Sequence, residues 1–162
     1  MIKLIASVCI DAPVAVVWAR LAKLEDIQLW SESILHASCD GKLVQGVGAE
    51  RTCRLAGNLT VQEQWIAWDE GHSFQYEGFG IPMVKRATNR WSVQPEGQRT
   101  LLISEAEVEL KGGLWGRLFE PIMRLMAGRM APNTLAGFKY LVEHGHPYAG
   151  KQSELPRMPA TC

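Results

Sequence analysis

One acidic residue, Glu63, lies in an apolar, strand-like segment and is the leading candidate for chemistry. Alternation over residues 61–68 places Val61, Glu63 and Trp65 on one strand face, but it does not decide which face points inward. If this face is internal, the carboxyl group loses solvent, which favours its neutral form and would let it exchange a proton near neutral pH. The alternative is that Glu63 pairs with Arg129 or accepts hydrogen bonds from backbone amides.

Three further polar side chains could hold or orient a ligand. Arg129 lies near the apolar stripe of a predicted helix, where a cation needs a partner such as Glu63 or a ligand carboxylate, unless its long side chain extends to solvent. Tyr76 and Asn89 can offer neutral hydrogen bonds to a carbonyl or phenol, or they satisfy a network within the core. Tyr76 is therefore a second catalytic candidate, as an assistant to Glu63.

Metal and cofactor chemistry have little support in the sequence. Two histidines are isolated, and His144 and His146 form a pair without a third ligand nearby. Phosphate-loop, dinucleotide-binding and nucleophile-elbow motifs are absent. Glu105, Glu107 and Glu109 alternate along one strand face, a pattern typical of solvent-exposed cross-strand ion pairs. We therefore expect neither a metal nor a cofactor.

Composition and charge exclude several classes of protein. The 162 residues are 47% hydrophobic, which suits one domain with one core. Lys plus Arg and Asp plus Glu each number 17, so no basic field exists to attract nucleic acid. The longest apolar run, 14–19, is too short to span a membrane, and Asp11 interrupts the N-terminal segment before a signal peptide could form. These features predict a cytoplasmic protein.

The four cysteines are widely spaced and form no Cys-x-x-Cys pair, so reduced thiols are expected. Cys9, Cys39 and Cys53 lie in apolar, strand-like segments, where they would pack as small hydrophobic residues. Only Cys162 is expected to be exposed.

The order of elements follows from periodicity and turn signals. Residues 4–10 alternate as a strand, residues 13–23 predict a short helix, and a second helical turn follows at 25–28. Six strands separated by glycine-rich turns are expected between 34 and 110. A long helix follows over 114–143, with Gly145 as its C-cap and two prolines within it. Its predicted buried stripe consists of Leu118, Ile122, Leu125, Met126, Met130, Phe138, Leu141 and Val142. Residues 1–145 would form the domain, and 146–162 a loosely ordered tail.

This order of elements resembles the START-like (SRPBCC, birch-pollen-allergen-type) superfamily, and local motifs resemble its polyketide cyclase/dehydrase branch. These motifs are Ile10-Asp11-Ala12-Pro13 followed by Val17-Trp18, then Leu29-Trp30, Gly46-Val47-Gly48, residues 63–69 and Leu141-Val142-Glu143. The resemblance covers residues 2–143. It implies an α+β helix-grip fold, in which a curved antiparallel sheet of about seven strands wraps around a long C-terminal helix, with two short helices after the first strand.

The resemblance also implies an internal cavity, because members of the superfamily line one with the concave sheet face and the inner side of the long helix. Carried over to this chain, the lining set is Glu63, Trp65, Tyr76, Asn89, Trp91, Ser104, Ala106, Ile122, Met126 and Arg129. Such a lining, mostly apolar with a few polar groups, is typical of a small-molecule site. The resemblance also implies that the Glu63 side chain points into this cavity.

Three functions are compatible with these features. The first is binding of a small hydrophobic molecule such as a lipid, an isoprenoid or a polyketide. The second is a cyclase or dehydratase in which Glu63, aided by Tyr76 or Arg129, moves a proton. The third is a protein- or membrane-interaction module that uses the Trp115 loop, whose neighbouring glycines would also suit a mobile lid. A homodimer is possible in each case.

Overall fold

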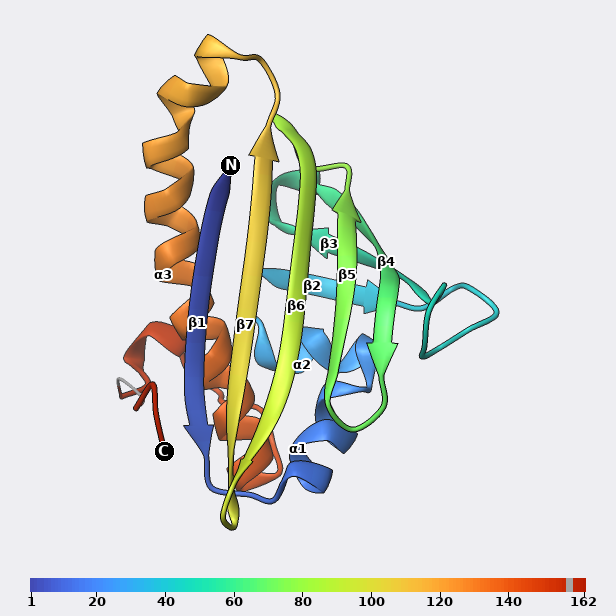
Figure 1. The fold of residues 1–162 in the computed structure, drawn as a ribbon, viewed down its shortest axis with the longest axis vertical. Coiled ribbons are helices and arrows are strands. Elements are labelled where there is room, and N and C mark those ends of the chain that lie inside the picture. The colour runs from blue at the N-terminus through green and yellow to red at the C-terminus, as the bar shows by residue number, and fades with distance from the viewer. Residues whose placement is uncertain (157–158) are drawn as a thin grey trace.

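The computed structural model describes residues 1–156 and 159–162, apart from the side chains of 114, 115 and 117. Seven strands form one antiparallel sheet in the order β1-β7-β6-β5-β4-β3-β2 (Figure 1). The strands are β1 (Ile2–Ile10), β2 (Ile34–Ser38), β3 (Glu50–Leu55), β4 (Thr60–Asp69), β5 (Ser73–Phe79), β6 (Val84–Glu96) and β7 (Arg99–Leu110). The predicted helix-grip sheet is thereby confirmed.

The turn between β3 and β4 sets the register that matters most for the site. Gly57 and Asn58 both have positive φ, at 75° and 59°, a conformation that glycine and asparagine tolerate better than other residues. The reversal pairs Arg54 with Thr60, and the same ladder places Arg51 opposite Glu63.

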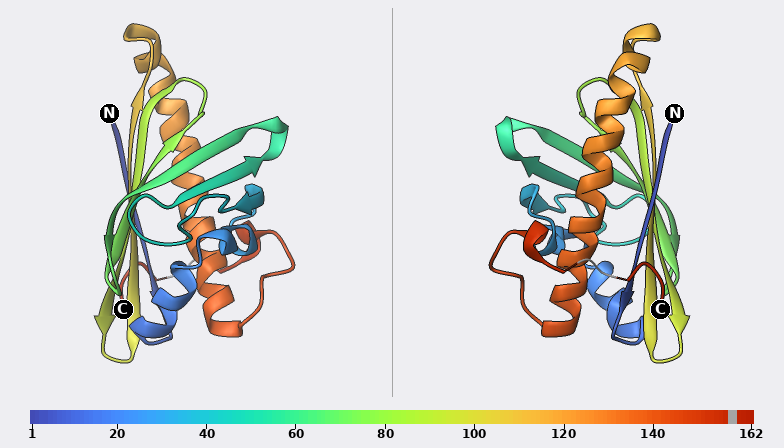
Figure 2. Two further views of the ribbon diagram at one scale, coloured as in Figure 1. Left: turned by 90° about the vertical axis from the view of Figure 1, so that its right-hand side faces the viewer. Right: turned by 90° about the vertical axis from the view of Figure 1, so that its left-hand side faces the viewer.

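Short helices close one end of the concave face. They are α1 (Val14–Leu21), the 3-10 turn η1 (Leu24–Asp26) and α2 (Ile27–Trp30), and Figure 2 shows them beside the lower part of the long helix. Trp18 of α1 packs edge-on against Trp68, with ring centroids 5.5 Å apart, and Trp30 of α2 packs against Phe138 at 5.0 Å. These aromatic contacts anchor the short helices to the sheet and to the long helix.

In the long helix α3 (Leu114–His144), the described side chains that are buried lie in the C-terminal half. Phe138 and Leu141 are 0% and 2% exposed, and Gly145 ends the helix in the left-handed conformation, as expected. The predicted buried stripe is wrong for the first half, where the exposed apolar residues are Leu118, Phe119, Ile122, Leu125, Met126 and Met130. The physical reason is that α1 and α2 supply packing partners beside the C-terminal half alone (Figure 2).

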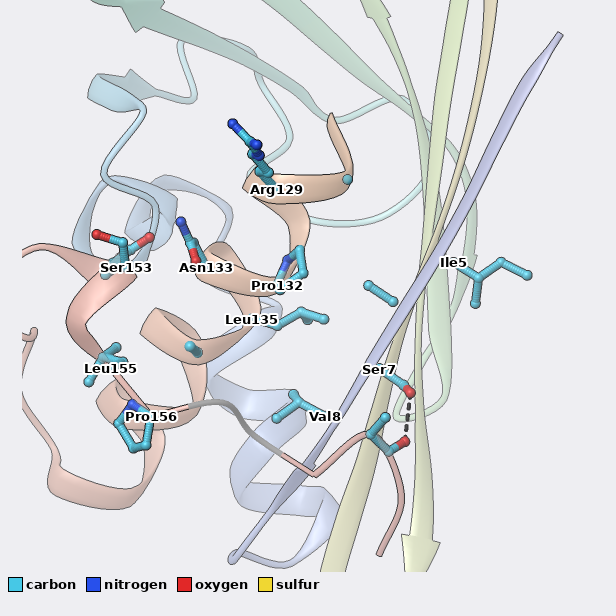
Figure 3. Close-up of a pocket in the computed structure, with 15 residues that line it drawn as sticks. Ile5, Ser7, Val8, Arg129, Pro132, Asn133, Leu135, Ser153, Leu155 and Pro156 are labelled. Atoms are coloured by element: carbon cyan, nitrogen blue, oxygen red, sulfur yellow. Dashed lines mark hydrogen bonds between the residues drawn. The ribbon is translucent and has the colours of Figure 1, made fainter. Parts of the chain in front are cut away.

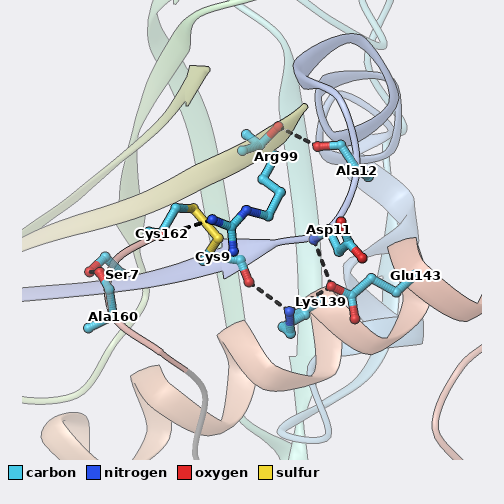
Figure 4. Close-up of a disulfide and its surroundings, with 10 residues drawn as sticks. Ser7, Cys9, Asp11, Ala12, Arg99, Lys139, Glu143, Ala160 and Cys162 are labelled. Carbon is cyan, nitrogen blue, oxygen red and sulfur yellow. Dashed lines mark hydrogen bonds and ion pairs between the residues drawn. A yellow bond between two sulfur atoms is a disulfide. The ribbon is translucent and has the colours of Figure 1, made fainter. Parts of the chain in front are cut away.

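The C-terminal tail packs against the domain, in contrast to the loosely ordered extension expected. We call its described residues, 146–156 and 159–162, the strap. The strap includes the 3-10 turn η3 (Gln152–Glu154), and Gln152 is buried, donating from Nε2 to the Trp30 carbonyl oxygen at 2.7 Å. Further on, the Ser7 hydroxyl donates to the Ala160 carbonyl oxygen at 2.6 Å (Figure 4).

A glycine in α3 makes room for the strap. A Cβ at Gly137 would lie 2.5 Å from the Trp30 carbonyl oxygen and against Nε2 of Gln152, closer than real Cβ atoms approach their neighbours. Gly137 therefore forms a notch that seats the Gln152 side chain. The C-terminal segment therefore packs at a defined position on α3. The residue pattern of the segment itself does not predict this position.

The expectation of four reduced thiols is wrong. Cys9 and Cys162 form a disulfide that joins β1 to the chain end over a sequence separation of 153 residues, while Cys39 and Cys53 are free (Figure 4). Spacing along the chain could not predict this pair, because the two cysteines meet only through the path of the strap. Among the described residues, none of the helices combines the length and apolarity needed to cross a lipid bilayer.

Candidate functional site between the sheet and the long helix

A cavity of about 250 Å³ lies between the concave sheet face and α3. Six strands and two helices supply its walls. Its lining residues are Leu4, Ala6, Ile27, Ser31, Ile34, Glu63, Tyr76, Asn89, Trp91, Ser104, Ala106, Ala127, Met130, Ala131 and Thr134. The walls are mostly apolar, with a small group of polar side chains on the sheet side, as small-molecule sites commonly have.

A directed series of hydrogen bonds crosses the sheet side of the cavity. The Ser104 hydroxyl donates to Oδ1 of Asn89 at 3.0 Å, and Nδ2 of Asn89 donates to the Tyr76 hydroxyl oxygen at 3.4 Å. The strands place these residues side by side, because Tyr76 lies opposite Asn89 in the β5–β6 ladder. Tyr76 accepts at the end of the series and donates to no described residue, so its O–H is available to an acceptor in the cavity.

Glu63 forms a buried ion pair with Arg51, a residue that the sequence analysis did not single out. Oε2 of Glu63 accepts from Nε and Nη2 of Arg51 at 2.7 and 2.6 Å, and the two residues are 9% and 4% exposed. The Cys53 thiol also donates to Oε2, at 3.4 Å. Oε1 accepts no hydrogen bond from the described residues, although Glu63 lines the cavity. The pairing with Arg129 that the sequence analysis considered is replaced by pairing with Arg51.

The Arg51 guanidinium is held on several sides. Nη1 donates to the Leu24 carbonyl oxygen at 2.6 Å, and the guanidinium carbon lies 4.9 and 5.7 Å from the ring centres of Trp65 and Tyr76. Burial is the largest single effect and would lower the pKa of Arg51, but the Glu63 carboxylate, with smaller contributions from Cys53 and Tyr76, raises this pKa above its usual value. Arg51 is a permanent buried cation, and Glu63 is its counter-ion.

Burial keeps the other titratable groups of the site neutral. It raises the pKa of the Cys53 thiol to about 12, with the Glu63 charge adding to the effect. It also raises the pKa of the Tyr76 phenol well above its usual range, and Glu63 again contributes. Tyr76 therefore remains a hydrogen-bond donor, and Cys53 is not an activated nucleophile.

Six of the residues expected to line the cavity do lie around it: Glu63, Tyr76, Asn89, Trp91, Ser104 and Ala106. The other four lie elsewhere. Trp65 is 1% exposed and packs against Tyr76, while Ile122 and Met126 are each 55% exposed on the outer part of α3. Arg129 lines a different cavity, described below. The Trp115 side chain, proposed for a lid or an interaction loop, is outside the described residues.

A signal for Arg51 was present in the sequence. Arg51 and Cys53 are two residues apart, so a strand that buries Cys53 also turns Arg51 inward. The Gly57-Asn58 turn then places Arg51 opposite Glu63. Combining the alternation of β3 with the hairpin register would have identified this partner.

The acidic row on β7 makes surface ion pairs. Glu107 pairs with Lys3 at 2.7 Å and Glu109 with Lys85 at 2.7 Å, all on the outer sheet face. Within residues 1–156 and 159–162, no three His, Cys, Asp or Glu side chains gather in a way that could hold a metal ion.

Comparison with known proteins identifies the family. Residues 1–143 match the family model described as "Polyketide cyclase / dehydrase and lipid transport". The chain belongs to this family. No curated protein matches it.

Several solved structures have a similar fold. A Thermus thermophilus protein is 17% identical with a TM-score of 0.72, and the match covers 89% of this chain and 99% of that one. Truncated norcoclaurine synthase from Thalictrum flavum is 16% identical with a TM-score of 0.69, covering 90% and 94%. A START superfamily protein from Mycobacterium smegmatis is 15% identical with a TM-score of 0.57, covering 80% and 94%. At these identities, the similarity shows the helix-grip fold alone.

Proposed function

We propose that this polyketide cyclase/lipid transport family member binds a small apolar molecule carrying one hydroxyl or carbonyl oxygen in the cavity between the sheet and α3. The observation that carries the proposal is the O–H of Tyr76, which is held at the end of the Ser104–Asn89 series and donates to no described residue. A ligand oxygen could accept this hydrogen bond, and a ligand hydroxyl could in turn donate to Oε1 of Glu63.

Cavity size and chemistry restrict the ligand further. About 250 Å³ holds a compact molecule of one or two rings or a short branched chain, and excludes a two-chain phospholipid. The apolar walls favour a body without charge, because Arg51 is already neutralised by Glu63. We therefore favour a carrier or sensor for a small isoprenoid- or polyketide-like compound.

The test uses 2-naphthol as a probe, with naphthalene as the matched compound that lacks the hydroxyl. Tyr76→Phe should weaken 2-naphthol binding by about 2- to 12-fold, because a net hydrogen bond contributes about 0.5–1.5 kcal/mol. Naphthalene binding should not change. Tyr140→Phe, at a tyrosine outside this cavity, is the control. Ala106→Phe should abolish binding of both probes by filling the cavity.

Native mass spectrometry of the freshly purified full-length protein should show a bound small molecule that is absent from Ala106→Phe. The proposal fails if 2-naphthol binds Tyr76→Phe as well as it binds the unmodified protein. It also fails if Ala106→Phe retains full affinity.

A second candidate function is proton transfer by Glu63 in a cyclase- or dehydratase-like enzyme. It is favoured by Oε1, which accepts no hydrogen bond from the described residues, and by the family's description. The Arg51 pair opposes it, because Glu63 already serves as the counter-ion of a buried cation. Glu63→Gln distinguishes the two functions: a carrier keeps its ligand, whereas an enzyme loses turnover while it still binds.

A further inference from the structure

A second cavity, of about 660 Å³, lies between β1, α3 and the strap (Figure 3). Its apolar walls are Val8 of β1, Leu135 and Ala136 of α3, and Leu155 and Pro156 of the strap. Neither Tyr76 nor Glu63, the ligand contacts of the proposed function, lines it, whereas Arg129, which the sequence analysis expected in the inner cavity, does. Its volume falls within the range of small-molecule sites, about 300–1,000 Å³.

Polar groups concentrate at one end of this cavity. Figure 3 shows Arg129 and Asn133 one helical turn apart on α3, with Ser153 of the strap facing Asn133, whereas Val8, Leu135 and Leu155 lie further along. Arg129 makes no ion pair with any described residue, and the Asn133 side chain makes no hydrogen bond with one. Residues at i and i+4 project on the same side of a helix, so both can donate to one acceptor group.

A third polar group lies on the strap side of the cavity. Gln152, 7% exposed, lines the cavity, and its amide oxygen is buried without a donor in the described part of the chain, while its Nε2 is committed to Trp30. Buried polar atoms are nearly always satisfied by protein, water or ligand, so a water molecule in the cavity is expected to donate to this oxygen, which the carboxylate proposed below cannot do.

We propose that the cavity under the strap binds an amphipathic carboxylate, with its carboxylate held by Arg129 and Asn133 and its apolar chain between Val8, Leu135 and Leu155. A guanidinium can bind a carboxylate through two parallel hydrogen bonds, and a neighbouring amide donor adds a third. The apolar end of the cavity excludes water from the chain. This site is independent of the proposed function, because it shares only Ala6 with the lining of the inner cavity.

The strap forms the outer wall of the site. The residues of the strap that line the cavity are Gln152, Ser153, Leu155, Pro156 and Ala160. The chain end is fixed to β1 by the disulfide and by the Ser7–Ala160 hydrogen bond (Figure 4). A ligand in the cavity would therefore contact the domain on one side and the strap on the other.

Decanoate is the probe, measured by isothermal titration on the full-length protein, with decyltrimethylammonium as the ligand of equal chain length and opposite charge. Decanoate should bind at least tenfold more tightly. Arg129→Gln should reduce decanoate affinity at least tenfold, and Ser153→Trp, at an exposed position on the rim, should abolish binding. Arg124→Gln, which removes an exposed arginine paired with Glu120 on the same helix, should leave affinity unchanged.

Ala106→Phe, which fills the inner cavity, should also leave decanoate binding unchanged, so failure of this site and failure of the 2-naphthol site are distinguishable. Circular dichroism establishes that each variant is folded. Absence of decanoate binding, equal affinity for the two charged probes, or full affinity in Arg129→Gln would each overturn the proposal. Loss of decanoate binding in Ala106→Phe would do so as well, because it would place the chain in the inner cavity.

Discussion

Removing the negative charge of Glu63 should destabilise the protein more than any change to a surface ion pair. In Glu63→Gln, Arg51 stays 4% exposed with its guanidinium against Trp65 and the Leu24 carbonyl, but without a counter-ion. A buried charge left unpaired costs about 3–5 kcal/mol. The cost comes from desolvation of the cation and exceeds the value of any one hydrogen bond.

The magnitude translates into a clear thermal shift. For a chain of this length, each 1 kcal/mol changes the melting temperature by about 2–4 °C, so Glu63→Gln should melt roughly 6–20 °C lower. Replacing both partners, Arg51→Met with Glu63→Leu, should recover most of this loss, because no charge then remains in the interior.

Urea unfolding followed by tryptophan fluorescence measures these differences, with Glu109→Gln as the matched control. Glu109 also pairs with a cation at 2.7 Å, but the side chains of Lys85 and Glu109 are 63% and 43% exposed. Glu109→Gln should lower the free energy of unfolding by only a small part of the loss in Glu63→Gln, because solvent screens the Lys85–Glu109 pair. A Glu63→Gln variant no less stable than Glu109→Gln would refute the assignment of a buried ion pair.

Three further changes test other parts of the structure. Gly137→Ala should lower the free energy of unfolding by about 1–3 kcal/mol through overpacking, although alanine favours helices. Gly128→Ala, with no atom within 4 Å of its Cβ, should raise it by up to about 1 kcal/mol. Thermal melts that rank the two variants the other way would contradict the notch at Gly137. Cys162→Ser should lower the free energy of unfolding in urea by up to about 5 kcal/mol, since the bond to Cys9 closes a loop of 153 residues. Thiol titration of the unmodified protein, denatured without reductant, should find two free thiols, not four. Two tryptophan N–H groups donate to Glu70 and lower its pKa below the usual 4.5, so its contribution to stability is present above that pH and is lost as the pH falls through the lowered pKa. Unfolding curves of Glu70→Gln and the unmodified protein should therefore differ at pH 7 and converge in acid, and a gap independent of pH would count against this carboxylate.

Much of the fold could be predicted from local patterns. Alternation along the chain indicated the strands, and glycine-rich turns separated them, because both signals depend only on neighbouring residues. Tyr76, Asn89 and Ser104 were expected around a cavity and lie there. Their alternation, combined with the family resemblance, placed them on the concave face.

The partners of the polar groups could be decided only by tertiary structure. Glu63 was a candidate from its own strand, but its role as counter-ion depends on Arg51, which the β3–β4 register places opposite it. The exposure of the first half of α3 could not be predicted either, because an apolar stripe does not specify whether another element covers it.

The position of the C-terminal residues was also decided by tertiary structure and not by local sequence. Their composition, with three prolines and few apolar residues, suggested a loose tail. The structure instead seats Gln152 in the notch at Gly137 and joins Cys162 to Cys9. The sequence by itself determined the strands, the helices and the residues available for an apolar pocket, since periodicity is local. Which charge faces which, which helix face is covered and where the chain end attaches were settled by contacts between residues far apart in the chain.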